Sequence, residues 1–152
     1  MPECVIRRAL TTEIADLGDI RRRASLSNDG DRDVLLAHPD ALEFAGEGVA
    51  DGRTRVATVA GQIVGFSTIL DAEDVVELED LFVDPPWMRK GIGLELVRDV
   101  VDRAIDRGAR CIEVTANPHA MAFYARAGFL PGGHAQTRFG PAARLRIDLG
   151  RQ

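Results

Sequence analysis

The stretch of residues 81–94 constrains the fold of this chain more than any other part of the sequence. An apolar, partly β-branched run stops at two prolines, passes a pair of cations and reaches two glycines two positions apart. This order predicts a strand, a loop and the start of a helix in immediate succession. The stretch reads Leu-Phe-Val-Asp-Pro-Pro-Trp-Met-Arg-Lys-Gly-Ile-Gly-Leu.

A loop of this kind favours the capture of an anion such as a pyrophosphate. The first turn of a helix leaves N–H groups without intrahelical acceptors, and the helix dipole adds partial positive charge there. Gly91 and Gly93 bring no side chain that would keep a phosphate from those donors. Arg89 and Lys90 add full positive charges nearby. The alternative is a tight strand-to-helix turn that binds nothing.

An ATP-type P-loop is a poor match to the same residues. In that motif the lysine follows the second glycine, whereas Lys90 precedes Gly91. The phosphate that this loop would accept therefore belongs to a different class of ligand.

Length and composition predict one domain. The chain has 152 residues, of which 45% are apolar, and this is enough for a sizeable core. We expect residues 1–152 to form that single domain. No apolar run is long enough to span a bilayer, and the N-terminus lacks the layout of a signal peptide. We therefore expect a cytoplasmic protein with no membrane partner.

Cysteine and histidine usage predicts no metal site. Cys4 and Cys111 lack metal-ligand spacing, and we expect both as reduced thiols. The three histidines are too scattered to suggest a shared metal ion. They are His38, His119 and His134.

The formal net charge of −5 argues against a nucleic-acid backbone as the partner. Seven acidic residues fall between positions 71 and 84 with no basic residue among them. Either they form a solvated surface, or their field attracts a cationic amine. The solvated surface is favoured for residues 71–74, and both interpretations stay open for residues 77–80. The seven are Asp71, Glu73, Asp74, Glu77, Glu79, Asp80 and Asp84.

Apolar periodicity and turn residues divide the first third of the chain into short elements. Proline, glycine and acids dominate its end, which predicts an irregular, mobile connection there. The predicted elements are an edge strand at 5–8, a helix from Thr11 or Thr12 to Ser27, a turn at 28–30, a helix at 32–37 and the irregular connection at 39–52.

The remainder predicts a meander of strands, followed by alternating helices and strands. Gly61-Gln62 reads as the turn of a hairpin, and Asn117 reads as a helix cap before Pro118. The predicted strands are 53–60, 63–70, 75–83, 111–115, 129–131 and 138–149. The predicted helices run from Gly93 to Gly108 and from Asn117 to Gly128, and a glycine-rich link spans residues 132–140.

Three segments within residues 77–129 resemble the GNAT superfamily of acyl-CoA-dependent N-acetyltransferases. Residues 78–85, Leu-Glu-Asp-Leu-Phe-Val-Asp-Pro, resemble its fourth strand, and residues 88–93, Met-Arg-Lys-Gly-Ile-Gly, occupy its Q/R-x-x-G-x-G/A loop. Asn117-Pro118 with residues 122–129 resembles its last conserved block. The earlier elements fit the family order, so the resemblance covers essentially the whole chain.

The resemblance implies a fold of the α/β class in the broad sense, in which helices and a mixed sheet combine (mixed α+β). The central sheet would be mostly antiparallel, its fourth and fifth strands would splay apart, and helices would cover both faces. Acetyl-CoA would serve as cosubstrate, with its pyrophosphate on the loop and its pantetheine arm between the splayed strands. Position 88 departs from the family, because Met88 stands where Gln or Arg is usual. The residues that the resemblance assigns to acetyl-CoA are Leu81, Phe82, Val83, Met88, Arg89, Lys90, Gly91, Ile92, Gly93, Leu94, Asn117 and Tyr124.

Acetyl transfer to an amine needs a base for the ammonium proton and a donor for the departing thiolate. Glu79 is the first candidate for the base, and Glu77 and Asp80 are the next candidates. Strand alternation places Glu77 and Glu79 on one face and Asp80 on the other, unless a bulge intervenes. Tyr124, the only tyrosine, falls at the family position whose phenol lies near the CoA sulfur. An ordinary phenol is protonated at pH 7 and can donate.

The amine acceptor is not identified by the sequence. The resemblance implies that its pocket is built from residues 21–26, 44–49 and 134–139, the segments that vary most within the family. A small amine, an amino acid or a protein N-terminus fits equally, and the chain could act alone or as a homodimer. A second hypothesis is a CoA-binding regulatory module that keeps the fold but has lost turnover.

Overall fold

A hairpin with two left-handed residues shows how local sequence shapes the first part of the fold. In the computed structural model, which describes residues 3–150, β2 (Thr54–Val59) pairs antiparallel with β3 (Gln62–Ala72). Ala60 and Gly61 form the turn, with φ of 51° and 82°. Positive φ at both central residues is typical of a type I′ hairpin turn. The turn predicted at residues 61–62 is therefore wrong by one residue.

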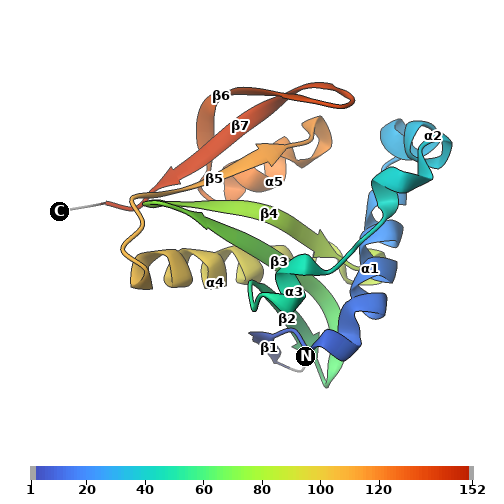
Figure 1. The fold of residues 1–152 in the computed structure, drawn as a ribbon, viewed down its shortest axis with the longest axis horizontal. Helices are drawn as coiled ribbons and strands as arrows, with labels where there is room; N and C mark the ends of the chain where they lie inside the picture. Colours follow the sequence, from blue (N-terminus) through green and yellow to red (C-terminus); the bar gives the residue numbers. More distant parts are fainter. Residues whose placement is uncertain (1–2, 151–152) are drawn as a thin grey trace. The chain divides into compact units, whose positions relative to one another are not determined.

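The seven strands follow the order β1-β2-β3-β4-β5-β7-β6 (Figure 1). The pairs β1–β2, β2–β3, β5–β7 and β6–β7 are antiparallel, whereas β4 and β5 are parallel. This arrangement confirms the predicted mixed α+β class with a mostly antiparallel sheet. The chain divides into two compact units, Met1–Thr68 with Asp80–Leu96, and Ile69–Glu79 with Val97–Gln152. We call them the first and second units.

The first unit holds β1 (Cys4–Arg8), β2, most of β3 and the end of β4 (Val75–Val83), which matches the strand predicted at 75–83. Its helical segments include the two predicted in the first third of the chain, of which the second starts three residues earlier than predicted, the start of the helix predicted from Gly93, and three short segments that the sequence did not predict. They are η1 (Thr11–Glu13), α1 (Ile14–Leu26), α2 (Asp29–Ala37), η2 (Pro39–Leu42), α3 (Glu47–Ala50), η3 (Pro85–Trp87) and the start of α4 (Ile92–Asp106).

Glu13, and neither threonine, satisfies the start of the first helical segment. Its carboxylate accepts the Leu10 backbone N–H at 2.8 Å and a bidentate pair of bonds from Arg7 at 2.7 and 3.0 Å. Leu10 occupies the N-cap position, so the prediction of Thr11 or Thr12 as the cap is wrong. The bonds from Arg7 lower the pKa of Glu13, which keeps this acceptor ionised.

The connection at residues 39–52 is more ordered than the sequence predicted. It contains η2 and α3, and it buries Leu42 and Val49. Gly48 lies so close to the sheet that an added Cβ would sit 2.5 Å from Thr68 Cγ2 and 2.7 Å from Thr54 Oγ1. Gly48 therefore marks close packing in this segment, and Pro39 begins a 3-10 helix.

Apolar side chains of the first unit gather in two clusters. One joins α1 and α3 to the strands, and the start of α4 packs in the other. Val56 and Ala57, neighbours on β2, fall in different clusters, so helices cover both faces of this part of the sheet. The first cluster holds Ala9, Leu17, Ile20, Val49, Val56 and Phe66, and the second holds Ala57, Val59, Val64, Ile92 and Leu96.

The second unit closes with a long hairpin, drawn in red in Figure 1, that lies beside β5. Gly132 and Gly133 lie inside its first strand, where the register shifts between Pro131 and His134. The glycine-rich link predicted at 132–140 is therefore mostly strand, because a bulge accommodates the glycines. The new elements are β5 (Cys111–Ala116), η4 (Pro118–Ala120), α5 (Met121–Arg126), β6 (Leu130–Thr137) and β7 (Gly140–Asp148).

The core of the second unit combines strands and helices. Buried residues alternate with more exposed ones from Ile112 to Ala116 of β5, as expected for a strand packed on one face, whereas Leu145 is the buried residue of β7. No helix within residues 3–150 is long and apolar enough to cross a bilayer. The buried apolar residues include Val76, Leu78, Val97, Val100, Ala104, Ile112, Val114, Tyr124, Phe129 and Leu145.

Gly65→Ala tests how tightly the end of β4 packs on β3. A Cβ at Gly65 would lie 2.8 Å from the Phe82 carbonyl oxygen and 3.4 Å from side-chain atoms of Ile92 and Leu96. We expect the free energy of unfolding to fall by about 1–3 kcal/mol, because the backbone of Phe82 would have to shift to make room for the methyl group. Denaturant titration measures this change.

Gly30→Ala is the matched control. Gly30 lies in α2 with no atom within 4 Å of an added Cβ, so alanine should be neutral or stabilise by up to about 1 kcal/mol. Equal stability of Gly65→Ala and the unmodified chain would contradict the close packing of β4 on β3.

Candidate active site

The segment between β4 and α4 holds two residues in the left-handed region. After Asp84, η3 spans Pro85–Trp87, and then Arg89 and Gly91 adopt φ of 63° and 86°. Glycine adopts this conformation freely, but arginine does so at a cost of about 1–2 kcal/mol. The surrounding structure must enforce this conformation at Arg89, as the β2–β3 hairpin does at Ala60.

The start of α4 presents backbone donors in this loop. Its first α-helical bond runs from Glu95 N–H to Gly91 O at 3.1 Å, so the N–H groups of Ile92, Gly93 and Leu94 precede the hydrogen-bonded ladder. Ile92 is 2% exposed and anchors the helix start in the second apolar cluster. The loop therefore combines fixed donors with the exposed side chains of Arg89 and Lys90.

Met88 is exposed and offers no polar atom that could replace the usual Gln or Arg. Its side chain is 36% exposed, and its backbone is extended, with φ −66° and ψ 154°. The donors at the start of α4 do not depend on it. Position 88 thus offers no side-chain donor, whereas the N–H groups at the start of α4 are present.

The last residues of β4 have backbone groups on the edge away from β3. Asp84 N–H donates to Val64 O at 2.9 Å, and the Phe82 carbonyl oxygen lies against Gly65. Alternate residues of a strand direct their N–H and C=O to opposite edges. Leu81 and Val83 therefore direct theirs away from β3, whereas Phe82 directs its own toward it.

The parallel ladder between β4 and β5 is short. Among the described residues it runs from Val75–Cys111 to Leu78–Val114, although β4 continues to Val83. The backbone groups of Leu81 and Val83 consequently have no β5 partner in this register. An extended ligand arm with amide groups could bond to them as a strand would.

Tyr124 is buried on α5 in the second unit. It is 8% exposed, and its ring contacts Phe123 and Phe129 with centroids 5.3 and 5.2 Å apart. Burial raises the pKa of Tyr124 to about 12, because the phenolate would lose its hydration. The phenol is therefore neutral and a proton donor throughout the physiological range.

Asn117 does not act as the helix cap that its position suggested. It occupies the N-cap position of η4, but its side chain makes no capping hydrogen bond, and the residue is exposed. The prediction of a cap is wrong in this respect. The side-chain amide keeps its hydrogen-bonding capacity for another partner.

Arg144 of β7 binds one candidate base. It donates to both carboxylate oxygens of Glu77, at 2.7 and 2.9 Å, and to Glu113 Oε1 and Thr115 Oγ1 at 2.9 Å each. The bonds to Glu77 raise the pKa of Arg144, so the guanidinium stays charged. Both oxygens of the Glu77 carboxylate are therefore engaged by one guanidinium. Glu79, two residues further along β4, is exposed.

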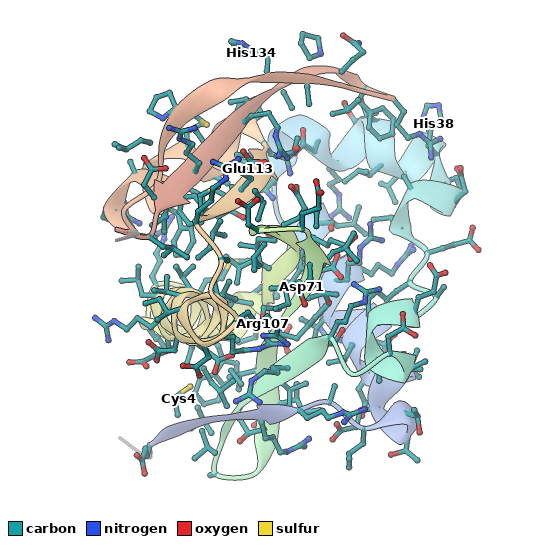
Figure 2. The ribbon with its side chains drawn as sticks, turned by 60° about the vertical axis from the view of Figure 1, so that its left-hand side comes forward. Cys4, His38, Asp71, Arg107, Glu113 and His134 are labelled. Atoms are coloured by element: carbon teal, nitrogen blue, oxygen red, sulfur yellow. The ribbon has the colours of Figure 1, made fainter. Side chains whose placement is uncertain are left out.

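Other acids of the predicted cluster also have arginine partners. Within the second unit, Arg107 Nε lies 3.1 Å from Asp71 Oδ2, and Arg110 Nε lies 2.9 Å from Asp74 Oδ2. Figure 2 labels the first of these pairs, as well as Glu113. An acidic field over residues 71–77 is therefore largely neutralised, which the run of acids alone did not indicate. Arg144 was missed too, because its partners lie 29 to 67 positions away.

The segments predicted to line an acceptor pocket lie in both units. In the first unit, residues 21–26 form the end of α1, and Phe44 packs edge-on against Phe66 with ring centroids 5.4 Å apart. Arg21 donates to Glu43 O at 2.9 Å and lies 5.7 Å above the Phe82 ring. In the second unit, residues 134–139 form the tip of the β6–β7 hairpin.

Known proteins share both this sequence pattern and this fold. An uncharacterized N-acetyltransferase of Methanocaldococcus jannaschii is 33% identical over 84 residues, covering 49% of this chain and 37% of that protein. The chain thus spans little more than a third of that relative. A GCN5-related N-acetyltransferase of Rhodopseudomonas palustris has a TM-score of 0.78 at 20% identity, over 98% of each chain.

A third similar protein was solved with a ligand. The PaiA N-acetyltransferase of Thermoplasma acidophilum, in complex with coenzyme A, has a TM-score of 0.76 at 14% identity. The likeness covers 96% of this chain and 99% of that one, and at this identity it establishes the fold alone. The sequence model of the acetyltransferase (GNAT) family matches residues 16–129, three quarters of the chain. This chain therefore belongs to the acetyltransferase (GNAT) family.

Proposed function

We propose that this chain is a single-domain N-acetyltransferase that moves the acetyl group of acetyl-CoA to a primary amine by direct attack. The observation that carries the proposal is the loop from Asp84 to Leu94, where left-handed Arg89 and Gly91 precede three backbone donors. Family membership and the buried phenol of Tyr124 support it.

Acetyl-CoA binds through its pyrophosphate and its pantetheine arm. The N–H groups of Ile92, Gly93 and Leu94 donate to the pyrophosphate, and Arg89 and Lys90 add positive charge. Met88 contributes only contact with the cosubstrate. The pantetheine amides bond to the backbone of Leu81 and Val83 on either side of Phe82, and Asn117 supplies a further amide.

The reaction needs a neutral amine, and Glu79 takes up the proton that the ammonium releases, directly or through water. The amine nitrogen then attacks the thioester carbon, and the carbon–sulfur bond breaks. Tyr124 donates its proton to the departing sulfur, which leaves as the free thiol of CoA. The nitrogen releases its second proton, which returns the Tyr124 phenolate to the phenol, directly or through water, and a neutral amide results. A neutral phenol is suited to this role, because negative charge develops on the sulfur as the carbon–sulfur bond breaks and the O–H group can donate to it.

Thiol release from acetyl-CoA across a panel of primary amines tests this proposal. The panel should hold an amino acid, an amino sugar, a polyamine and a peptide with a free N-terminus. We expect release only with an accepted amine, and a kcat lowered about 10²- to 10³-fold in Tyr124→Phe. Glu79→Gln should lower kcat/KM more than Arg110→Gln, which removes an exposed ion pair instead.

Three outcomes separate the hypotheses. Turnover supports the enzyme. Thermal stabilisation by acetyl-CoA with no turnover on any amine would support a CoA-binding regulatory module instead. No stabilisation at all would remove both. The binding constant for CoA should be the same in Tyr124→Phe, because the phenol acts only on the departing group.

The pH dependence of kcat offers a separate prediction. The protonated form of Tyr124 is the active one, and its pKa is raised to about 12, so the donor is lost only as pH rises through that value. We expect kcat to rise with pH as the amine loses its proton, and not to fall below pH 10. A fall below pH 9 that Tyr124→Phe abolishes would contradict the assignment.

Gly91→Ala tests the pyrophosphate cradle, and Gly61→Ala is its matched control. Both glycines are left-handed, with φ of 86° and 82°, and neither has an atom within 4 Å of an added Cβ. Alanine should destabilise the fold by about 1–2 kcal/mol at either site. Only Gly91→Ala should weaken CoA binding, by roughly tenfold in calorimetry, because Gly61 lies in the β2–β3 turn.

Met88→Ala completes this test. We expect its affinity for CoA to stay within about threefold of the unmodified chain, since exposed contacts contribute little. A loss as large as that of Gly91→Ala would show that the side chain at position 88, and not the backbone, holds the pyrophosphate.

A further inference from the structure

Asp84, the residue that ends β4, is a buried carboxylate held by an arginine of α1. Only 7% of Asp84 is exposed. Arg23 Nε donates to its Oδ1 at 2.9 Å, and Arg23 NH2 donates to its Oδ2 at 3.0 Å. These bonds raise the pKa of Arg23, so the cation persists. A buried carboxylate without such a partner would be strongly destabilising, and the pair therefore fixes where Asp84 can lie.

The position of Arg23 is itself fixed by the core. Leu17, Ile20 and Ala24 are buried on the same helix, and the first two belong to the first apolar cluster. Side chains three or four residues apart share a helix face, so Ile20 and Ala24 anchor the turn that carries Arg23. The guanidinium consequently reaches Asp84 from a rigid support.

Asp84 is also the hinge between β4 and the loop. Its N–H donates to Val64 O at 2.9 Å, and its carbonyl accepts the Trp87 N–H at 2.8 Å. Trp87 packs against the second apolar cluster, which also contains Ile92 of α4. The Asp84 carboxylate thus ties this junction to α1 through an ion pair.

We propose that Arg23 is a positioning residue for the coenzyme loop, acting through Asp84 and touching neither substrate. The bidentate pair sets the direction in which the chain leaves β4, and it thereby places the backbone donors of Ile92, Gly93 and Leu94 for the pyrophosphate. This inference rests on the proposed function for the identity of the ligand. The placement of the loop itself can be measured without any ligand.

Trp87 gives that measurement, because it is the only tryptophan in the chain and lies three residues after Asp84. In Arg23→Gln we expect a red-shifted emission and about a twofold increase in acrylamide quenching. Without the ion pair, the direction in which the chain leaves β4 is no longer fixed, and Trp87 becomes more exposed to water. Arg22→Gln is the matched control. Arg22 is the exposed neighbour on α1, and its loss changes the net charge equally.

Calorimetry with CoA gives the second measurement, well below the unfolding temperature. We expect Kd to rise about tenfold in Arg23→Gln and to stay unchanged in Arg22→Gln. Arg23→Lys should fall between them, because an ammonium cannot form the bidentate pair. The double variant R23Q/D84N, in which two neutral amides replace the ion pair, should be no weaker than R23Q alone.

The outcomes separate this inference from the proposed function. Tight CoA binding by the unmodified chain with an unchanged Kd in Arg23→Gln would overturn the inference and leave the proposed function standing. No CoA binding by the unmodified chain would overturn the proposed function, and the fluorescence of Trp87 would still decide whether Arg23 positions the loop. A lower unfolding temperature with unaltered Trp87 fluorescence and Kd would reduce Arg23 to a structural role.

Discussion

The turn from β4 into α4 is the constraint on which the rest of the proposed site depends. Arg89 and Gly91 must both be left-handed for the chain to reverse there, and apolar anchors hold the segment on either side. Val83 and Trp87 pack before the reversal, and Ile92 packs after it, all on one cluster. The loop is exposed at its tip yet fixed at both ends. Such a loop can present backbone N–H groups to an anion without first having to order them.

Arginine pairing organises the charges around this framework. In the first unit Arg23 holds the buried Asp84, and in the second unit Arg144 holds Glu77 and Glu113. Arginines also neutralise Asp71 and Asp74 in the acidic cluster at 71–84. These carboxylates therefore do not contribute to a free anionic field. The same pairing engages one of the candidate bases, because both oxygens of Glu77 accept from Arg144.

The sequence was sufficient to predict those helices and strands whose positions follow from local periodicity or from the family motifs. The strand at 75–83 and the ends of the first helix were placed closely, because strand alternation and helical periodicity act over a few residues, although the predicted cap was wrong. The interpretation failed where distant residues decide. Gly48 and Val49 pack against β2 and β3, so the connection at 39–52 is ordered, and Gly132-Gly133 fit a bulge that only pairing with β7 defines. The sequence offered one signal for a role of Arg144. It is a charged residue next to the apolar Leu145 in a predicted strand, which places its side chain on the opposite face of the sheet.

Amide hydrogen exchange with and without CoA tests the central claim most directly. In the free protein the first-turn amides of α4 lack intrahelical acceptors, so they should exchange quickly. Bound CoA should slow exchange at Ile92, Gly93 and Leu94 and at Leu81 and Val83, and it should leave the turn at Ala60–Gly61 unchanged. Protection elsewhere in the chain, with exchange across residues 81–94 unaffected, would contradict the assignment of this stretch as the coenzyme-binding loop.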